Sequence, residues 1–272
     1  MLIDYLSDLH MEKMKLKSIE DYLMKQLKPK NGDILLLNGD ISDDDYELYE
    51  LVNMIKKNTD SKMIFTFGNH ETWSKTSTKN HIKELKQELT SLGVKVLINE
   101  KINLQELDKT FLDMNLYGAF IYYDFEFTEN HFDLTKEEIK EVWLKQNDAH
   151  KTSGFFNENR CYKRISNKGQ KLLEKQEDID IFVNHFTPYN FFINHIYKEI
   201  YMINKFYREP SMGNVTFNSD ILESKNPKYV FAGHMHSRHK WKDPKSGTLY
   251  MVNVKHDPFL NYIEQVEIKK ED

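Results

Sequence analysis

Short apolar runs recur along the chain, and most of them stop abruptly at polar residues. Such runs occupy residues 2–10, 33–40, 62–70, 94–99, 178–188 and 228–236. A strand that is covered on both faces shows continuous rather than alternating hydrophobicity. These runs therefore predict buried strands. Two further strands are expected at 248–254 and 261–268, and the second alternates as a half-exposed strand does.

Helical patterns fill the intervals between these runs. Residues 42–58 start with acidic side chains, offer Ser42 as an N-cap and repeat apolar residues at helical spacing from Leu48 to Ile55. A second pattern, at 78–93, is expected to stop at Gly93. Alternating strands and helices are typical of an α/β fold, in which helices flank a central sheet.

The middle of the chain is less regular. Residues 122–177 are rich in charge and contain helical patterns such as 135–146. Residues 186–217 carry many aromatic side chains, and the spacing from Phe192 to Ile203 predicts a helix there. No repeat, low-complexity tract or linker-like stretch interrupts the sequence. We therefore expect one domain over 1–272, with a helical and aromatic elaboration at about 122–217.

Composition narrows the classes of function. The formal net charge of −5 argues against a protein that binds nucleic acid through a basic surface. No apolar stretch is long enough to span a membrane, and the first residues do not resemble a signal peptide. The single cysteine, Cys161, cannot form an internal disulfide. These features favour a cytoplasmic protein without a membrane partner.

The candidate chemistry lies where the apolar runs stop. The polar residues at these points are Asp8, His10, Asp40, Asn69, His70, His185, His234 and His236. In an open α/β sheet, the carboxyl ends of the strands form the crevice that binds ligands. We therefore expect these side chains to converge, although they are far apart in the sequence.

The local spacing supports this expectation. In an extended backbone, residues two apart point to the same side, so Asp8 and His10 can address one point, as can His234 and His236. Glycine precedes three of the polar residues, at Gly39, Gly68 and Gly233. Glycine at such a position permits a tight turn and a close approach of the backbone to a ligand.

The residue types indicate a metal centre. Carboxylate, imidazole and amide groups without a thiolate suit hard or borderline divalent ions. Seven of these residues are candidate ligands, namely Asp8, His10, Asp40, Asn69, His185, His234 and His236. Seven ligands are too many for one tetrahedral site, but they suit two ions that share a bridging carboxylate.

The full series of motifs resembles the calcineurin-like metallophosphoesterases. It comprises Asp8-Leu-His10, Gly39-Asp40, Gly68-Asn69-His70-Glu71, His185 and Gly233-His234-Met-His236. Both the order of the motifs and their strand-end placement match that family. The resemblance implies a four-layer α/β/β/α sandwich with a central mixed β-sheet structure.

The resemblance also implies a role for each residue. Asp8, His10 and His236 would hold a first metal ion. Asn69, His185 and His234 would hold a second, and Asp40 would bridge the two. His70 would be the catalytic histidine, Asn69 and His70 would contact the substrate, and Glu71 would orient His70 or its loop. Manganese is the expected ion, with iron, zinc, cobalt or nickel as alternatives.

The implied reaction is hydrolysis of a phosphate ester by a hydroxide that bridges the two ions, with His70 as the proton donor to the leaving group. Phosphoprotein phosphatases of the family carry an Asp-Arg-Gly run after the second motif. This chain has "GDISDDDYE" there, without arginine. A monoester dianion needs extra positive charge, so the shortage of arginine favours a phosphodiester, with phosphomonoesterase activity as the alternative.

Two readings outside this class stay open. The chain could be a non-catalytic scaffold on the same fold, although such relatives lose ligands that this sequence keeps. A nucleotide or nucleic-acid partner could stack on the aromatic segment at 186–217, but no Gly-rich phosphate-binding loop supports a general nucleotide-binding module.

Overall fold

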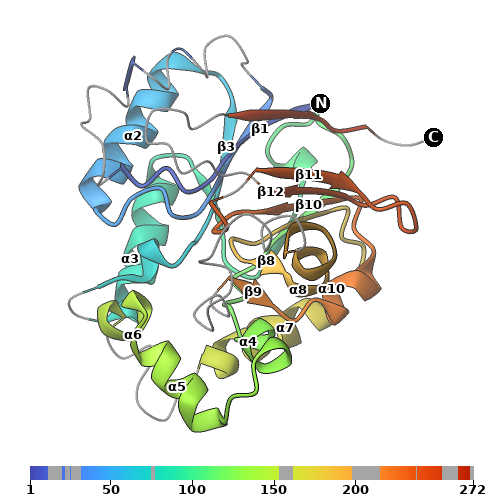
Figure 1. Cartoon of the computed structure of the whole chain (residues 1–272). Helices are drawn as coiled ribbons and strands as arrows, with labels where there is room; N and C mark the ends of the chain where they lie inside the picture. Colours follow the sequence, from blue (N-terminus) through green and yellow to red (C-terminus); the bar gives the residue numbers. More distant parts are fainter. Residues whose placement is uncertain are drawn as a thin grey trace.

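The computed structural model describes residues 1–11, 20, 21, 25, 32–74, 77–152, 162–197, 215–236, 238–252 and 263–269. Two β-sheets are stacked against each other at the centre of the molecule, and helices lie outside them (Figure 1). The fold is mixed α/β. It therefore confirms the class predicted from the sequence, with the two sheets that the family resemblance implied rather than one.

The first sheet holds five strands in the order β13-β1-β2-β3-β4. Their bounds are β1 Leu2–Leu6, β2 Ile34–Asn38, β3 Lys62–Thr66, β4 Lys95–Leu97 and β13 Glu264–Glu267. The four strands from β1 to β4 run parallel, and β13 runs antiparallel beside β1. Their carboxyl ends consequently lie along one edge of the sheet.

The second sheet holds six strands in the order β11-β12-β10-β7-β6-β5. Their bounds are β5 Glu100–Asn103, β6 Asn115–Gly118, β7 Ile181–Val183, β10 Tyr229–Ala232, β11 His239–Lys242 and β12 Leu249–Val252. The four inner strands are parallel, whereas β5 and β11 close the edges in the antiparallel direction.

Register places matching apolar rows between the two sheets. In the first sheet, Tyr5 lies opposite Leu36, and Leu36 lies opposite Ile64. In the second sheet, Phe231 lies opposite both Val183 and Met251. All six side chains belong to one buried cluster, and the rings of Tyr5 and Phe231 are 5.1 Å apart. This inter-sheet core fixes the two sheets face to face.

Helices cover the outer faces. Figure 1 shows α2 (Asp45–Asn58) and α3 (Thr78–Ser91) beside the first sheet. The buried stripe of α2 is Leu48, Leu51, Val52 and Ile55. This stripe belongs to the same buried cluster as the outward residues of β2 and β3. The predicted cap at Ser42 is wrong, because the Asp44 carboxylate accepts hydrogen bonds from the first-turn amides of Tyr46 and Glu47.

Two stretches elaborate the second sheet. Between β6 and β7 lie α4 (Glu126–His131), α5 (Lys136–Leu144), α6 (Asn147–Lys151) and α7 (Tyr162–Glu174). Between β7 and β10 lie β8 (Thr187–Pro188), α8 (Tyr189–Phe191), the π-helix η4 (Phe192–Tyr197), β9 (Thr216–Phe217) and α10 (Asp220–Lys225). The short 3-10 helices are η2 (His70–Thr72) and η3 (Leu104–Glu106).

These stretches bear on the predicted elaboration. The helix predicted from 192 to 203 starts as a π-helix, and its continuation lies outside the described residues. The prediction of a single domain over 1–272 stays a prediction. Among the helices of the described ranges, none combines the length and apolar character that crossing a bilayer requires.

Candidate metal centre

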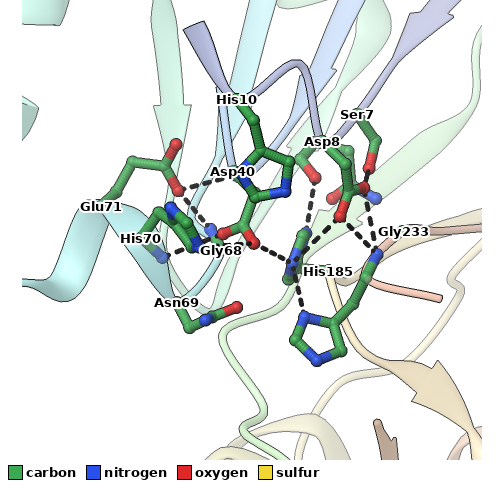
Figure 2. Close-up of polar contacts among 12 residues, drawn as sticks. Ser7, Asp8, His10, Asp40, Gly68, Asn69, His70, Glu71, His185 and Gly233 are labelled. Atoms are coloured by element: carbon green, nitrogen blue, oxygen red, sulfur yellow. Dashed lines mark hydrogen bonds and ion pairs between the residues drawn. The ribbon is translucent and has the colours of Figure 1, made fainter. Parts of the chain in front are cut away.

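The predicted site residues lie at the carboxyl ends of strands from both sheets. Figure 2 shows Asp8, His10, Asp40, Asn69, His70 and His185 close together, and the side chains of His234 and His236 lie within the same clusters of donor atoms. Asp8 and His10 follow β1, Asp40 follows β2, Asn69 and His70 follow β3, His185 follows β7, and His234 and His236 follow β10. The parallel direction of these strands brings their ends to one place.

The donor atoms form three overlapping groups, in each of which all atoms lie within 4.8 Å of one another. The groups are Asp8 with His10 and His236; Asp8 and Asp40 with His185 and His234; and His10 with Asp40 and His70. Asp8 is shared by the first two groups and Asp40 by the last two. The geometry therefore gives both carboxylates a position between neighbouring groups.

The backbone reaches this arrangement in an unexpected way. Asp8, His10, Asp40, His234 and His236 all have positive φ angles, between 49° and 66°. They lie beyond the ends of their strands, so the extended alternation predicted for Asp8–His10 and His234–His236 is wrong. Left-handed turns bring the side chains together instead. Such conformations cost on the order of 1–3 kcal/mol each and cluster at functional sites.

Glycine makes the close packing of these turns possible. A Cβ atom at Gly68 would collide with the carboxylate of Asp40, and one at Gly233 would collide with the hydroxyl of Ser7. The space above both glycines is therefore filled by the polar groups of the site. The tight turns predicted at these glycines agree with this packing, whereas the close approach of a ligand stays a prediction.

In the first group, two imidazoles and one carboxylate converge. Nε2 of His10 lies 3.1 Å from Nε2 of His236, which lies 3.5 Å from Oδ1 of Asp8. The Asp8 carboxylate is itself held by the backbone amide of His234, at 3.0 Å, and by the hydroxyl of Ser7. These contacts fix the carboxylate between the two sheets.

His185 is the centre of the second group. Its Nε2 atom lies 3.3 Å from Oδ2 of Asp40 and 3.2 Å from Nδ1 of His234. Its Nδ1 atom donates a hydrogen bond to the carbonyl of Asn38 at 2.9 Å, because a carbonyl can only accept. This bond orients the ring and directs Nε2 into the site, as the outer partners of metal-binding histidines commonly do.

Asn69 lies on the loop after β3, beside His70 (Figure 2). Its amide nitrogen donates to Oδ1 of Asp148 at 3.1 Å. Its own Oδ1 is buried and has no hydrogen-bond partner among the described residues. A buried amide oxygen without a partner is costly unless something else binds it. The donor set and this oxygen together fit a divalent cation.

Electrostatics agree with that conclusion. Burial raises the pKa of Asp8 to about 6. Burial alone would lower the pKa of His185, but the carboxylates of Asp40 and Asp8 raise it to about 10. Burial, followed by the neighbouring His185, holds the pKa of His234 well below its usual range. The two buried carboxylates thus attract positive charge, which divalent cations would supply.

His70 lies at the rim of the cluster. Its side chain is 13% exposed, and its Nε2 atom is 3.8 Å from Oδ2 of Asp40. The backbone amide of His70 donates to Oδ1 of the same carboxylate at 2.9 Å. The ring packs on Trp73 with centroids 3.7 Å apart. His70 thus lies beside the candidate ligands with its ring only partly exposed.

Glu71 holds the loops rather than the His70 ring. Its carboxylate accepts hydrogen bonds from the backbone amides of Asp40, Ile41 and Gly68, at 2.9, 2.8 and 2.8 Å. Burial and the nearby Asp40 raise the pKa of Glu71 to about 7. Of the two roles expected for Glu71, the contacts support the orientation of the local loop.

Sequence reasoning missed Asp148 and Trp73. Asp148 lies on α6, within the charged stretch that was predicted only as an elaboration, and nothing in its local sequence marks it. Trp73 stands two residues after the Gly68–Glu71 motif, and an aromatic residue at that place was a usable signal. Both residues contact the predicted site through hydrogen bonds or ring packing.

Comparisons with known proteins identify the family of the chain. A family model described as calcineurin-like phosphoesterase matches residues 1–238. The fold is similar to the crystal structure of phosphopantetheinyl hydrolase from Mycobacterium tuberculosis, at 17% identity and a TM-score of 0.70, with 97% of this chain and 95% of that chain covered.

A dimetal phosphatase from Danio rerio is a weaker match, at 12% identity and a TM-score of 0.48, with 97% of this chain and 91% of that chain covered. No curated protein matches the chain. At these identities, the likeness to the mycobacterial structure shows the fold alone.

Proposed function

Because the chain belongs to the calcineurin-like phosphoesterase family, whose members are metal-dependent hydrolases of phosphoric ester bonds, we propose that it hydrolyses a phosphodiester at the strand-end site. The observation that carries the proposal is the convergence of two carboxylates and five imidazoles in three overlapping clusters at the ends of five strands. The buried Asn69 oxygen, which has no hydrogen-bond partner among the described residues, supports it. Each of these side chains comes from a motif of the family series.

We assign the ligands as the resemblance to the family implies. Asp8, His10 and His236 would hold one ion. His185, His234 and the Asn69 oxygen would hold the other, and Asp40 would lie between them. Manganese suits this mixture of nitrogen and oxygen donors, as do iron, zinc, cobalt and nickel.

Two divalent ions bound there would lower the pKa of a water molecule and neutralise charge on the phosphate. The chain's own groups then have separate tasks. In the protein by itself, burial would raise the pKa of Asp40, but the imidazoles of His185 and His70 hold that pKa well below its usual range, so the carboxylate is ionised and available to a cation. A protonated His70 ring would be stabilised by the Asp40 carboxylate, and it can donate its proton to the leaving oxygen.

The preference for a diester rests on charge. A monoester dianion needs more positive charge than a diester monoanion. Of the arginines in the described residues, Arg238 pairs with Glu264 on β13 and Arg164 is exposed on α7. Neither offers a guanidinium clamp for phosphate at the site.

A phosphomonoesterase is the second candidate, and one observation favours it. The ammonium group of Lys151 lies 3.7 Å from the centroid of the Trp73 ring, which packs on His70. Lys151 therefore brings a cation to the rim of the site, where it could meet an additional phosphate charge.

The test compares two aryl esters. Protein purified without chelator and supplied with Mn²⁺ is expected to hydrolyse bis-p-nitrophenyl phosphate faster than p-nitrophenyl phosphate. Chelation, or the substitution Asp40→Asn, should abolish both activities. A faster monoester reaction would reverse the ester preference, and bound metal without any turnover would favour the non-catalytic scaffold.

A substrate panel can also include a protein that carries a phosphopantetheinyl group, since the mycobacterial neighbour is by name a phosphopantetheinyl hydrolase. A nucleotide diester belongs in the same panel, because it tests whether the aromatic segment at 186–217 stacks a base.

A further inference from the structure

One carboxylate that lies outside the family motifs contacts Asn69, a candidate metal ligand. Asp148 lies on α6, and its side chain is 3% exposed. It accepts hydrogen bonds from the Asn69 amide nitrogen at 3.1 Å, from the Trp73 indole nitrogen at 2.7 Å and from the Tyr123 hydroxyl at 2.9 Å. These three donors come from two separate parts of the chain.

We propose that Asp148 is a positioning residue that orients Asn69 so that its oxygen, and not its nitrogen, faces the second metal ion. The inference rests on the proposed function, because it takes Asn69 as a metal ligand. It adds a residue from the elaboration between β6 and β7 to the machinery that the strand-end motifs form.

The physical reason is the symmetry of an amide. The oxygen and the NH₂ group of an asparagine side chain are nearly the same size, so shape alone does not select one orientation. An ionised carboxylate can only accept hydrogen bonds, so Asp148 selects the NH₂ group of Asn69. The opposite end of the amide is then the oxygen, and it is this oxygen that is buried without a partner among the described residues.

The Asp148 carboxylate also contacts Trp73. Trp73 can only donate through its indole nitrogen, and Asp148 receives that bond. The Trp73 ring in turn packs on His70. Asp148 therefore supports both a candidate ligand and the surface against which the candidate catalytic ring rests.

Backbone contacts fasten α6 to this loop. The amide of Ser74 donates to the carbonyl of Lys151 at 2.8 Å, and Ser74 forms an isolated parallel bridge with Thr152. Helix α6 is thus attached to the segment that carries Asn69, His70 and Trp73. These backbone contacts hold α6, and with it Asp148, next to the candidate site.

The substitution Asp148→Asn tests the proposal with Mn²⁺ binding as the readout. The amide introduced at position 148 cannot accept hydrogen bonds from all three donors. The Asn69 side chain is then no longer held with its NH₂ group toward position 148. We expect the affinity for the second Mn²⁺ ion to fall by about 10–100-fold, as is typical when an outer partner of a metal ligand is removed. The first ion, at Asp8, His10 and His236, should bind as in the wild type.

Two measurements separate the ions. Isothermal titration gives the two affinities, and electron paramagnetic resonance distinguishes a coupled Mn²⁺ pair from a single ion. In Asp148→Asn, the spectrum at limiting Mn²⁺ should show isolated ions where the wild type shows the pair. Thermal unfolding checks that each variant is folded.

Tyr123→Phe is the matched control. It removes a hydrogen bond from the same carboxylate but leaves the contact with Asn69 in place. It should leave both Mn²⁺ affinities unchanged. The double variant Asn69→Asp with Asp148→Asn exchanges the carboxylate and the amide, restores a hydrogen bond between the two positions and should recover the second ion relative to Asp148→Asn.

The outcomes are distinct. Selective loss of the second ion in Asp148→Asn, with recovery in the double variant, supports the proposal. Wild-type affinities in Asp148→Asn, or an equal loss in Tyr123→Phe, would overturn it while the proposed function stands. If Asp148→Asn does not fold, failure of the folded double variant to bind a second ion overturns the proposal. Absence of a Mn²⁺ pair from the wild type would overturn the proposed function as well.

Discussion

At the scale of single residues, the site concentrates backbone strain and buried charge. Asp8 and Asp40 are buried carboxylates in left-handed backbone, and each touches imidazoles from other strands. Such strain persists only when the surroundings over-determine it. Here Glu71 provides part of the restraint, because its carboxylate accepts hydrogen bonds from three backbone amides in two loops.

His70 carries the prediction that belongs to this scale. If His70 protonates the leaving oxygen, His70→Ala should slow the hydrolysis of an alkyl phosphodiester by about 10²–10⁴-fold. The loss should be smaller for a p-nitrophenyl ester, because p-nitrophenolate leaves without a proton. The measurement is kcat for both esters in the wild type and the variant.

The His70→Ala variant should also keep its metal content, since His70 lies at the rim of the ligand groups. Equal rate losses for the two esters would remove the proton-donor role. A loss of bound metal would instead make His70 a ligand, as its place in the group with His10 and Asp40 allows.

At the scale of elements, the continuous apolar runs predicted most of the buried strands, but they missed β6, an inner strand of the second sheet with three buried residues. The residues of β2 are completely buried, and their sequence shows no alternation. The edge strand β5 was missed, because Glu100 and Lys101 are exposed and interrupt any apolar run. Short edge strands with charged side chains give a weak signal by their nature.

The candidate site was predictable to a similar extent. The strand-end motifs identified every residue of the three ligand groups, because each motif stands next to a recognisable strand. The left-handed turns at Asp8 and His234 were not predicted, since sequence spacing is equally compatible with extended backbone. Asp148 was not predictable, because its contact with Asn69 joins positions 79 residues apart.

Gly68 gives the prediction at this scale. A Cβ at Gly68 would lie 2.6 Å from the backbone nitrogen of Asp40 and would collide with its carboxylate. Gly68→Ala should therefore displace Asp40 and weaken Mn²⁺ binding, as isothermal titration would show. Overpacking of this kind typically costs about 1–3 kcal/mol of stability.

Gly247→Ala is the matched control for that variant. Gly247 has a φ angle of 77°, but no atom lies near the added Cβ. Its replacement should lower the unfolding temperature without changing Mn²⁺ affinity. If Gly68→Ala bound Mn²⁺ as tightly as the wild type, the loops would tolerate more movement than their packing indicates.

At the scale of the whole molecule, the stacking of two sheets explains why the site can exist. β1, β2 and β3 bring Asp8, His10, Asp40, Asn69 and His70, whereas β7 and β10 bring His185, His234 and His236. The inter-sheet core that includes Tyr5 and Phe231 holds these two halves in register. The elaboration after β6 then adds α6 and Asp148 to one side. The cytoplasmic location expected from composition stays a prediction.

The most direct test of the central claim is a crystal structure with Mn²⁺, measured for anomalous scattering. The account predicts two anomalous peaks at the strand ends. One should lie among Asp8, His10 and His236, and the other beside His185, His234 and the Asn69 oxygen, with Asp40 between them. No peak at the strand ends, or peaks that avoid these side chains, would contradict a two-metal phosphoesterase.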